Sequence, residues 1–184
     1  MQPNWFVALR ATVEPPVEYP PLKDGMRLLH PEDLHITVSF FGSLREDPTE
    51  RLRDILPAMH CPPSTALATT VHLLPRKEFA SVVALGFGEE SDHLRAYIAQ
   101  WRNQLRTLVG LPPEQRPILP HLTIVRMKPT RDRRLIAERQ QWMQALAERL
   151  PFSVHISGVG LFTWQERFLQ HQPRYRTTLH IPFD

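Results

Sequence analysis

One tetrapeptide pattern occurs twice in this chain, and the two copies lie 86 residues apart. Residues 35–38 are His-Ile-Thr-Val and residues 121–124 are His-Leu-Thr-Ile, so both follow the order His, aliphatic, Thr, β-branched aliphatic. Each copy lies in a run rich in β-branched and aromatic residues, which is typical of a strand. Alternate residues of a strand point to one face, so each His shares a face with its Thr while the aliphatic residues point into a core. The repeat therefore predicts two related strands in a pseudo-symmetric fold.

The rest of the chain alternates between strand-like and helix-like stretches. Apolar and aromatic runs predict strands, and apolar residues at helical spacing predict helices. A mixture in this order favours an α+β protein with antiparallel sheets. The predicted strands are 5–10, 26–30, 34–41, 66–74, 80–87, 121–127, 152–164 and 175–183, the predicted helices are 47–59, 91–110 and 131–150, and a proline-rich loop covers 14–24.

Composition narrows the class of protein. The 184 residues fit one domain, 1–184, and 42% hydrophobic with 22% charged residues is typical of a soluble globular protein. No run approaches the roughly 18 apolar residues of a membrane helix, and the first residues do not form a signal peptide. The single cysteine, Cys61, excludes an internal disulfide and a cysteine-built zinc site, so we expect a cytoplasmic protein. Most of the 22 basic residues are arginines, which suits a phosphate-bearing substrate but also follows from genomic base composition.

Two imidazoles and two hydroxyls on one cleft suit phosphodiester cleavage without a metal ion. One His can remove a proton from the attacking water, the other can protonate the leaving oxygen, and the Thr hydroxyls can hold the phosphoryl oxygens. No carboxylate or thiol accompanies either motif at metal-ligand spacing, so we expect neither a metal site nor a cofactor. The alternative for the two histidines is a pair of hydrogen-bonded core residues, and for the two threonines it is ordinary β-propensity.

With these motifs the sequence resembles the 2H phosphoesterase superfamily, and within it the RNA 2′,3′-cyclic phosphodiesterases, also called 2′-5′ RNA ligases. The similar segments are residues 5–9, 31–42, 120–126 and 160–162, together with Tyr175. The resemblance implies a bilobal 2H phosphoesterase-like fold, with two antiparallel sheets, flanking helices and a central cleft that carries both His-x-Thr-x motifs.

The resemblance also implies a reaction and a role for each site residue. The reaction is metal-independent hydrolysis of a terminal 2′,3′-cyclic phosphate to a 2′-phosphate. His35 is implied as the proton donor to the departing 3′ oxygen, and His121 as the proton acceptor that activates water. Thr37, Thr123 and Arg126 are implied to bind the substrate. The expected partner is RNA with a 2′,3′-cyclic phosphate end, or a small cyclic nucleotide, bound by a monomer without membrane contact.

Three residues near the motifs have open roles. A regular strand places Arg126 on the face opposite His121, so its substrate role requires a bend or a bulge; otherwise it is a solvated arginine. By alternation Ser39 and Phe41 share the face of His35. Ser39 could line the cleft or be a tolerated polar residue, and Phe41 could stack on a base or pack in the core.

Two other functions remain compatible with the sequence. One is a non-catalytic module that binds RNA ends or nucleotides, although such a module could lose either His freely. The other is 2′-5′ RNA ligase activity at the same site, which is the same chemistry with a different nucleophile. A metallohydrolase is disfavoured because neither His has a carboxylate at ligand spacing.

Overall fold

Strands dominate the part of the chain that the computed structural model describes, which is residues 3–60, 64–75, 80–165 and 172–183. Cys61 lies outside these residues. The elements, in chain order, are β1 (Asn4–Glu14), β2 (Met26–Leu28), β3 (His35–Ser43), α1 (Thr49–Leu52), β4 (Thr65–Leu74), β5 (Val82–Phe87), α2 (Asp92–Leu108), β6 (His121–Met127), α3 (Arg133–Ala147), β7 (Phe152–Trp164) and β8 (Tyr175–Pro182), with 3-10 turns at Pro31–Asp33, Leu56–Ala58 and Glu89–Ser91.

The strands pair antiparallel in the order β1-β3-β6-β5-β4-β7-β8, and β2 pairs with β6. β1 also pairs with β7, so six strands form a closed ring of hydrogen-bonded neighbours. The predicted α+β class with antiparallel sheets is confirmed, and the two expected sheets are joined into one system. The junction between β3 and β6 is narrow, because Ile36 and Leu122 form the one residue pair recorded there.

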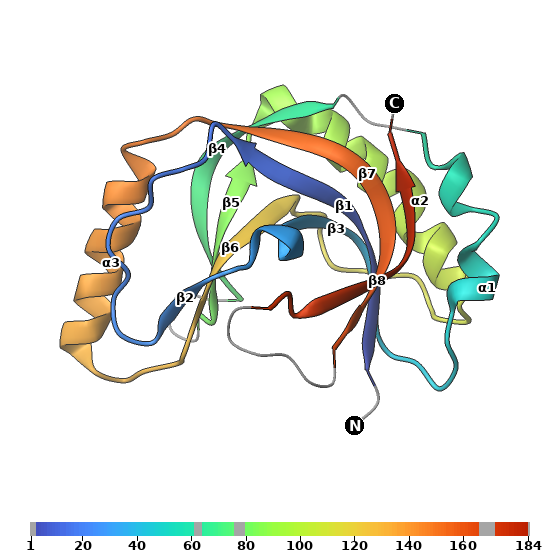
Figure 1. Cartoon of the computed structure of the whole chain (residues 1–184), viewed down its shortest axis with the longest axis horizontal. Helices are drawn as coiled ribbons and strands as arrows, with labels where there is room; N and C mark the ends of the chain where they lie inside the picture. The colour runs from blue at the N-terminus through green and yellow to red at the C-terminus, as the bar shows by residue number, and fades with distance from the viewer. Residues whose placement is uncertain (1–2, 61–63, 76–79, 166–171, 184) are drawn as a thin grey trace.

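The helices cover the strands from two sides, with α3 on one side and α1 and α2 on the other (Figure 1). The helical spacing of Leu94, Ile98, Trp101, Leu105 and Leu108 predicts an apolar face on α2. The first four are buried, whereas Leu108, in the last turn, is exposed. Trp142 of α3 is also buried, and its indole N–H donates to the Pro20 carbonyl at 2.8 Å. The proline-rich loop is therefore packed against α3.

The predicted helix over residues 47–59 is wrong in length. The structure has only the short helix α1 and a separate 3-10 turn at Leu56–Ala58. Asp47 does accept a hydrogen bond from the Thr49 N–H at 2.8 Å, as a helix start requires. Pro57 explains the early end, because a proline ring clashes with the carbonyl four residues before it, here that of Arg53. Arg53 is the residue at which α1 stops.

Candidate active site

The two motif strands lie side by side and run in opposite directions. Ile36 of β3 pairs with Leu122 of β6, and these are the aliphatic second residues of the two motifs. In an antiparallel pair this register puts His35 opposite Thr123 and Thr37 opposite His121. Each imidazole therefore has the other motif's hydroxyl beside it, on the face away from the buried Ile36 and Leu122.

Each motif histidine is held by its own backbone. Nδ1 of His35 lies 2.6 Å from the Asp33 carbonyl oxygen, and Nδ1 of His121 lies 2.8 Å from that of Leu119. A carbonyl can only accept, so Nδ1 carries the hydrogen and donates it in both rings. The other ring nitrogen, Nε2, then accepts a proton when the ring is neutral and donates one when it is charged. The site therefore contains two acid–base groups with the same backbone support, and the role of each depends on its charge.

Aromatic rings surround His35. The Phe6 ring lies 4.8 Å from it, centroid to centroid, and the Tyr175 ring meets it edge-on at 5.3 Å. The pKa of His35 is lowered to about 4: burial among these rings is the largest cause, the Asp33 backbone bond opposes it, and the charges of His121 and Arg126 add to the lowering. In the free protein His35 is therefore neutral at neutral pH, with Nε2 as an acceptor.

Both motif strands contain a bulge, and both bulges fall directly after the Thr. The register with β1 skips Val38, and the register with β5 skips Ile124. An extra residue reverses the alternation of faces beyond it. The side chain five residues after each His, Phe40 in one strand and Arg126 in the other, consequently joins the cleft face.

The two bulges determine whether Arg126, Ser39 and Phe41 face the cleft or the core. Arg126 lines the same hollow as His35 and Thr123, so the bulge that its substrate role requires is present. Phe41 is 6% exposed and packs in the core, whereas Phe40 is 43% exposed and lines the cleft. Ser39 is buried, and its hydroxyl donates to the Arg102 carbonyl of α2 at 3.0 Å, so it does not line the cleft. The predicted sharing of a face by Ser39, Phe41 and His35 is wrong, because the strand is not regular there.

Arg126 is tied to His35 through Tyr175. Its Nη2 donates to the Tyr175 hydroxyl at 2.6 Å, and the Tyr175 ring contacts His35. The buried carboxylate of Asp33 accepts the backbone N–H groups of Arg174 at 2.8 Å and Tyr175 at 3.0 Å. Asp33 thus holds His35 through its backbone and Tyr175 through its side chain. Asp33 and Phe40 are site residues that the sequence did not single out.

The site consists of two adjoining hollows. One, of about 180 Å³, is lined by His35, Thr37, Thr123 and Arg126 among others. The second, of about 390 Å³, is lined by His121 and by arginines of α2 and the following loop. Thr37 and Phe40 line both, so the hollows meet between the two histidines. Each of the five site residues inferred from the sequence therefore lines one of two hollows that share Thr37 and Phe40.

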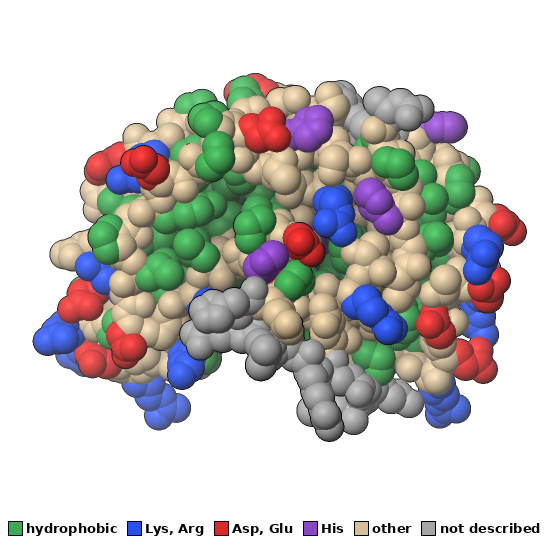
Figure 2. Space-filling view, viewed as in Figure 1, with side chains coloured by type: hydrophobic (Ala, Val, Ile, Leu, Met, Phe, Trp, Pro, Cys, Tyr) green, Lys and Arg blue, Asp and Glu red, His purple; other side chains and the backbone are tan. Residues whose placement is uncertain are grey.

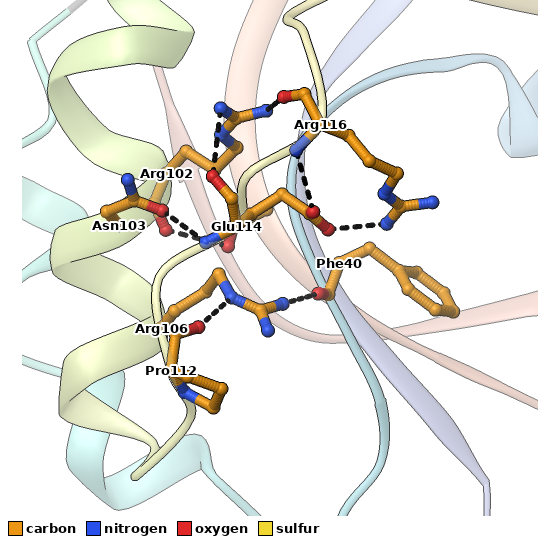
Figure 3. Close-up of polar contacts among 8 residues, drawn as sticks. Phe40, Arg102, Asn103, Arg106, Pro112, Glu114 and Arg116 are labelled. Atoms are coloured by element: carbon orange, nitrogen blue, oxygen red, sulfur yellow. Dashed lines mark hydrogen bonds and ion pairs between the residues drawn. The ribbon is translucent and has the colours of Figure 1, made fainter.

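Arginines of α2 hold the loop that forms the far wall of the second hollow. Arg102 donates to the Arg116 carbonyl at 2.9 Å, and Arg106 donates to the carbonyls of Pro112 at 2.6 Å and Phe40 at 2.7 Å (Figure 3). Arg116 forms a 2.5 Å ion pair with Glu114, and this hydrogen-bonded arginine lowers the pKa of Glu114 to about 2. The guanidinium groups of Arg102 and Arg106 are therefore engaged in fixing the loop before β6.

Histidine side chains occur at several separate places on one face of the molecule (Figure 2), so a histidine does not by itself mark the site. Among the described residues no group of three or more His, Cys, Asp or Glu side chains could hold a metal ion. The two motif histidines differ from the others in being paired across β3 and β6.

Comparisons with known proteins give one family match and several similar folds. Residues 90–167, which include the second motif, match the family described as LigT like Phosphoesterase. Escherichia coli LigT in complex with 3′-AMP has a similar structure, with a TM-score of 0.63, 17% identity and 99% coverage of both chains. A second crystal structure, described as a phosphoesterase, matches with a TM-score of 0.58, 18% identity and 98% coverage of both chains. A protein from Thermus thermophilus matches with a TM-score of 0.56 and 16% identity, over 98% of this chain and 97% of its own. No significant match is found among curated protein sequences.

The chain thus combines a closed antiparallel fold with two adjacent His-x-Thr strands. The family match over residues 90–167 and the similar folds support the 2H phosphoesterase superfamily. The family supports an enzyme that acts on phosphodiesters. Among the described residues no helix is long and apolar enough to cross a membrane.

The burial of His35 predicts a pH-dependent cost to stability. Its pKa is about 4 in the folded protein and about 6.5 when unfolded, so the unfolded chain binds more protons between these values. The free energy of unfolding should therefore fall as the pH falls from 6.5 towards 4. Between pH 7.5 and 4.5 the wild type should lose about 2.5 kcal/mol more than His35→Gln, as measured by urea unfolding. Equal losses in the two proteins would contradict the buried, neutral state of His35.

Proposed function

We propose that this protein hydrolyses the 2′,3′-cyclic phosphate at the end of an RNA to a 2′-phosphate, without a metal ion. The observation that carries the proposal is the antiparallel pairing of the two motifs. It places two imidazoles and two hydroxyls on two adjoining hollows, and Arg126 adds a positive charge to the hollow lined by His35. Hydroxyls and a guanidinium suit the phosphoryl oxygens, and two opposed imidazoles suit the two proton transfers.

In the proposed mechanism His121 Nε2 accepts a proton from water as the water oxygen attacks phosphorus. The bond from phosphorus to the 3′ oxygen breaks, and His35 Nε2 supplies that oxygen with a proton. His35 must therefore be charged when substrate is bound, although its pKa is about 4 in the free protein. An anionic phosphate beside the imidazole favours the charged form, so substrate binding itself loads the donor with its proton.

Nucleotide substrates are supported by the neighbouring side chains and by a protein of similar fold. Escherichia coli LigT has been crystallised with 3′-AMP, ATP and NADP⁺. In this chain the exposed Phe40 ring lies where the two hollows meet, and it offers a surface on which a base can stack. The cytoplasmic location, the monomeric state and the single-domain organisation stay predictions.

The first test is the reaction itself. A short RNA that ends in a 2′,3′-cyclic phosphate should be converted to the 2′-phosphate product, at equal rates with and without EDTA. Chromatography against authentic 2′- and 3′-phosphate standards identifies the product. Activity that disappears with EDTA and returns with a divalent ion contradicts the metal-free mechanism, and a product that is entirely 3′-phosphate contradicts the assigned donor.

The second test separates the proton donor from the acceptor. His35→Ala and His121→Ala should each lose about 10²–10⁴-fold in kcat on the cyclic phosphate, and the double variant should be little worse than either, because the two act as a unit. A diester with a 4-nitrophenolate leaving group needs no proton at that oxygen. On this substrate His35→Ala should recover most of its activity while His121→Ala stays impaired. The reverse pattern exchanges the two roles.

The third test concerns the base. Phe40→Ala should raise KM for a nucleotide substrate about 5- to 50-fold with little change in kcat, because stacking on an aromatic ring contributes about 1–3 kcal/mol. A cyclic phosphate of a ribose without a base should show no such change. Phe41→Leu is the matched control: it should lower the melting temperature and leave KM unaltered, since Phe41 is in the core. An unchanged KM in Phe40→Ala rules out stacking there.

A further inference from the structure

The two ends of the site offer a nucleotide different side chains. Because β3 and β6 run in opposite directions, the residues that follow their two bulges lie at opposite ends of the site. Phe40 lies beyond His121, where the second hollow begins. Arg126 lies beyond His35, in the first hollow. The site therefore has an aromatic end and a cationic end.

The proposed direction of attack determines how a ribose lies between these two ends. The leaving 3′ oxygen is at His35, so C3′ is on the Arg126 side and C2′ is on the Phe40 side. C2′ is bonded to C1′, which carries the base, and C3′ is bonded to C4′, which carries the 5′ carbon. The base therefore points towards Phe40, and the 5′ end of the terminal nucleotide points towards Arg126.

Two further arginines lie at the Arg126 end. Arg27 of β2 is opposite Arg126 in the register of β2 with β6, and opposite residues of an antiparallel pair point to the same face. Arg174, just before β8, has its Cζ 4.7 Å from the centre of the Trp164 ring, which lines the first hollow. Burial is the largest cause of the lowered pKa of Arg174, and the charges of Arg126 and Arg27 contribute to it. The three guanidiniums are therefore close enough to repel one another.

An anion among these guanidiniums would remove the repulsion. The cyclic phosphate carries a single negative charge and lies between the motif strands, within reach of Arg126. The first hollow measures only about 180 Å³, less than the roughly 300 Å³ of the smallest ordinary ligand sites. A nucleotide whose cyclic phosphate is in this hollow therefore extends past its rim. The next negative charge along an RNA chain is the phosphodiester that joins the terminal nucleotide to the one before it.

We propose that Arg27 and Arg174 bind the phosphodiester on the 5′ side of the terminal nucleotide. The inference rests on the proposed function, because the direction of the ribose follows from proton donation by His35 to the 3′ oxygen. A guanidinium has five N–H donors in its plane, so Arg174 can stack on Trp164 with its face and donate to a phosphate with its edge. The subsite distinguishes the end of an RNA chain from a free cyclic mononucleotide.

The test compares two dinucleotides that end in the same 2′,3′-cyclic phosphate. One has an ordinary phosphodiester between its nucleotides, and the other has a methylphosphonate, in which a methyl group replaces the charged oxygen. The measured quantity, the charge ratio, is kcat/KM for the phosphodiester divided by kcat/KM for the methylphosphonate. A change that affects only the cyclic phosphate or the bases acts on both substrates alike, so the charge ratio reports on the internal phosphate.

The wild type should have a charge ratio of about ten or more, because hydrogen bonds to a charged group are strong. Arg27→Gln and Arg174→Gln should each lower it about threefold or more, and the double variant should bring it below about two. Arg27→Lys keeps the charge but loses the planar fork, so its ratio should lie between those of the wild type and Arg27→Gln. Added salt should lower the wild-type ratio and hardly change that of the double variant.

Arg176→Gln is the matched control. Arg176 of β8 is exposed and pairs with Thr163, one residue along from Tyr175, whose ring lines the first hollow. Alternation along the strand therefore places the Arg176 side chain on the other face. The variant removes the same charge from the same strand and should leave the charge ratio unchanged. If Arg174→Gln does not fold, Arg27→Gln and Arg27→Lys still provide the test.

The outcomes separate the subsite from the proposed function. A wild type that hydrolyses both dinucleotides with a charge ratio near one overturns the subsite alone. A high ratio that Arg27→Gln leaves unchanged, or that Arg176→Gln lowers as much as Arg27→Gln does, also overturns it. A wild type that hydrolyses neither dinucleotide overturns the proposed function and the subsite with it.

Discussion

A single antiparallel contact, between Ile36 and Leu122, determines the geometry on which the candidate chemistry depends. These two residues join β3 to β6, and they are the second residues of the two motifs. Because the strands run in opposite directions, the contact puts each imidazole next to the other motif's hydroxyl. A slip of one residue in either strand would turn that strand's histidine towards the core and its aliphatic side chain towards the cleft. Burial of the aliphatic residues therefore protects the alignment of the polar ones.

The bulges extend this symmetry beyond the visible repeat. Each strand bulges directly after its Thr, and each thereby turns the residue five positions after its His towards the cleft. One strand uses this position for the aromatic ring of Phe40 and the other for the guanidinium of Arg126. The same backbone device thus supplies two different chemistries, one suited to a base and one to a phosphate. The two motif strands therefore share a backbone shape, but the residue after the bulge differs, as do the base and the phosphate of a nucleotide.

The sequence predicted the elements well where a local signal decides them. β6 and β7 match the expected strands residue for residue, and α2 buries the apolar residues at helical spacing except Leu108 in its last turn. The helix over residues 47–59 was predicted too long, because Pro57 ends a helix that the spacing of apolar residues would continue. The placement of Phe41 rather than Phe40 on the cleft face was also wrong, because a bulge in β3 interrupts the alternation of its side chains. A bulge leaves no mark in composition, yet the repeat contained the information: Arg126 required a bulge after the second motif, and the first motif has the same spacing.

Asp33 shows why some site residues could not be found from the sequence. Its carboxylate binds the backbone of Arg174 and Tyr175, which lie about 140 residues further along the chain. No local pattern indicates such a contact, because it exists only once β8 has folded beside β7. The contact has a direct chemical consequence. Tyr175 contacts the His35 ring and accepts from Arg126, so the aromatic enclosure that lowers the pKa of His35 depends on a carboxylate two residues before it. The pKa of His35 therefore depends on long-range packing, whereas the two imidazoles themselves can be identified from the local sequence repeat.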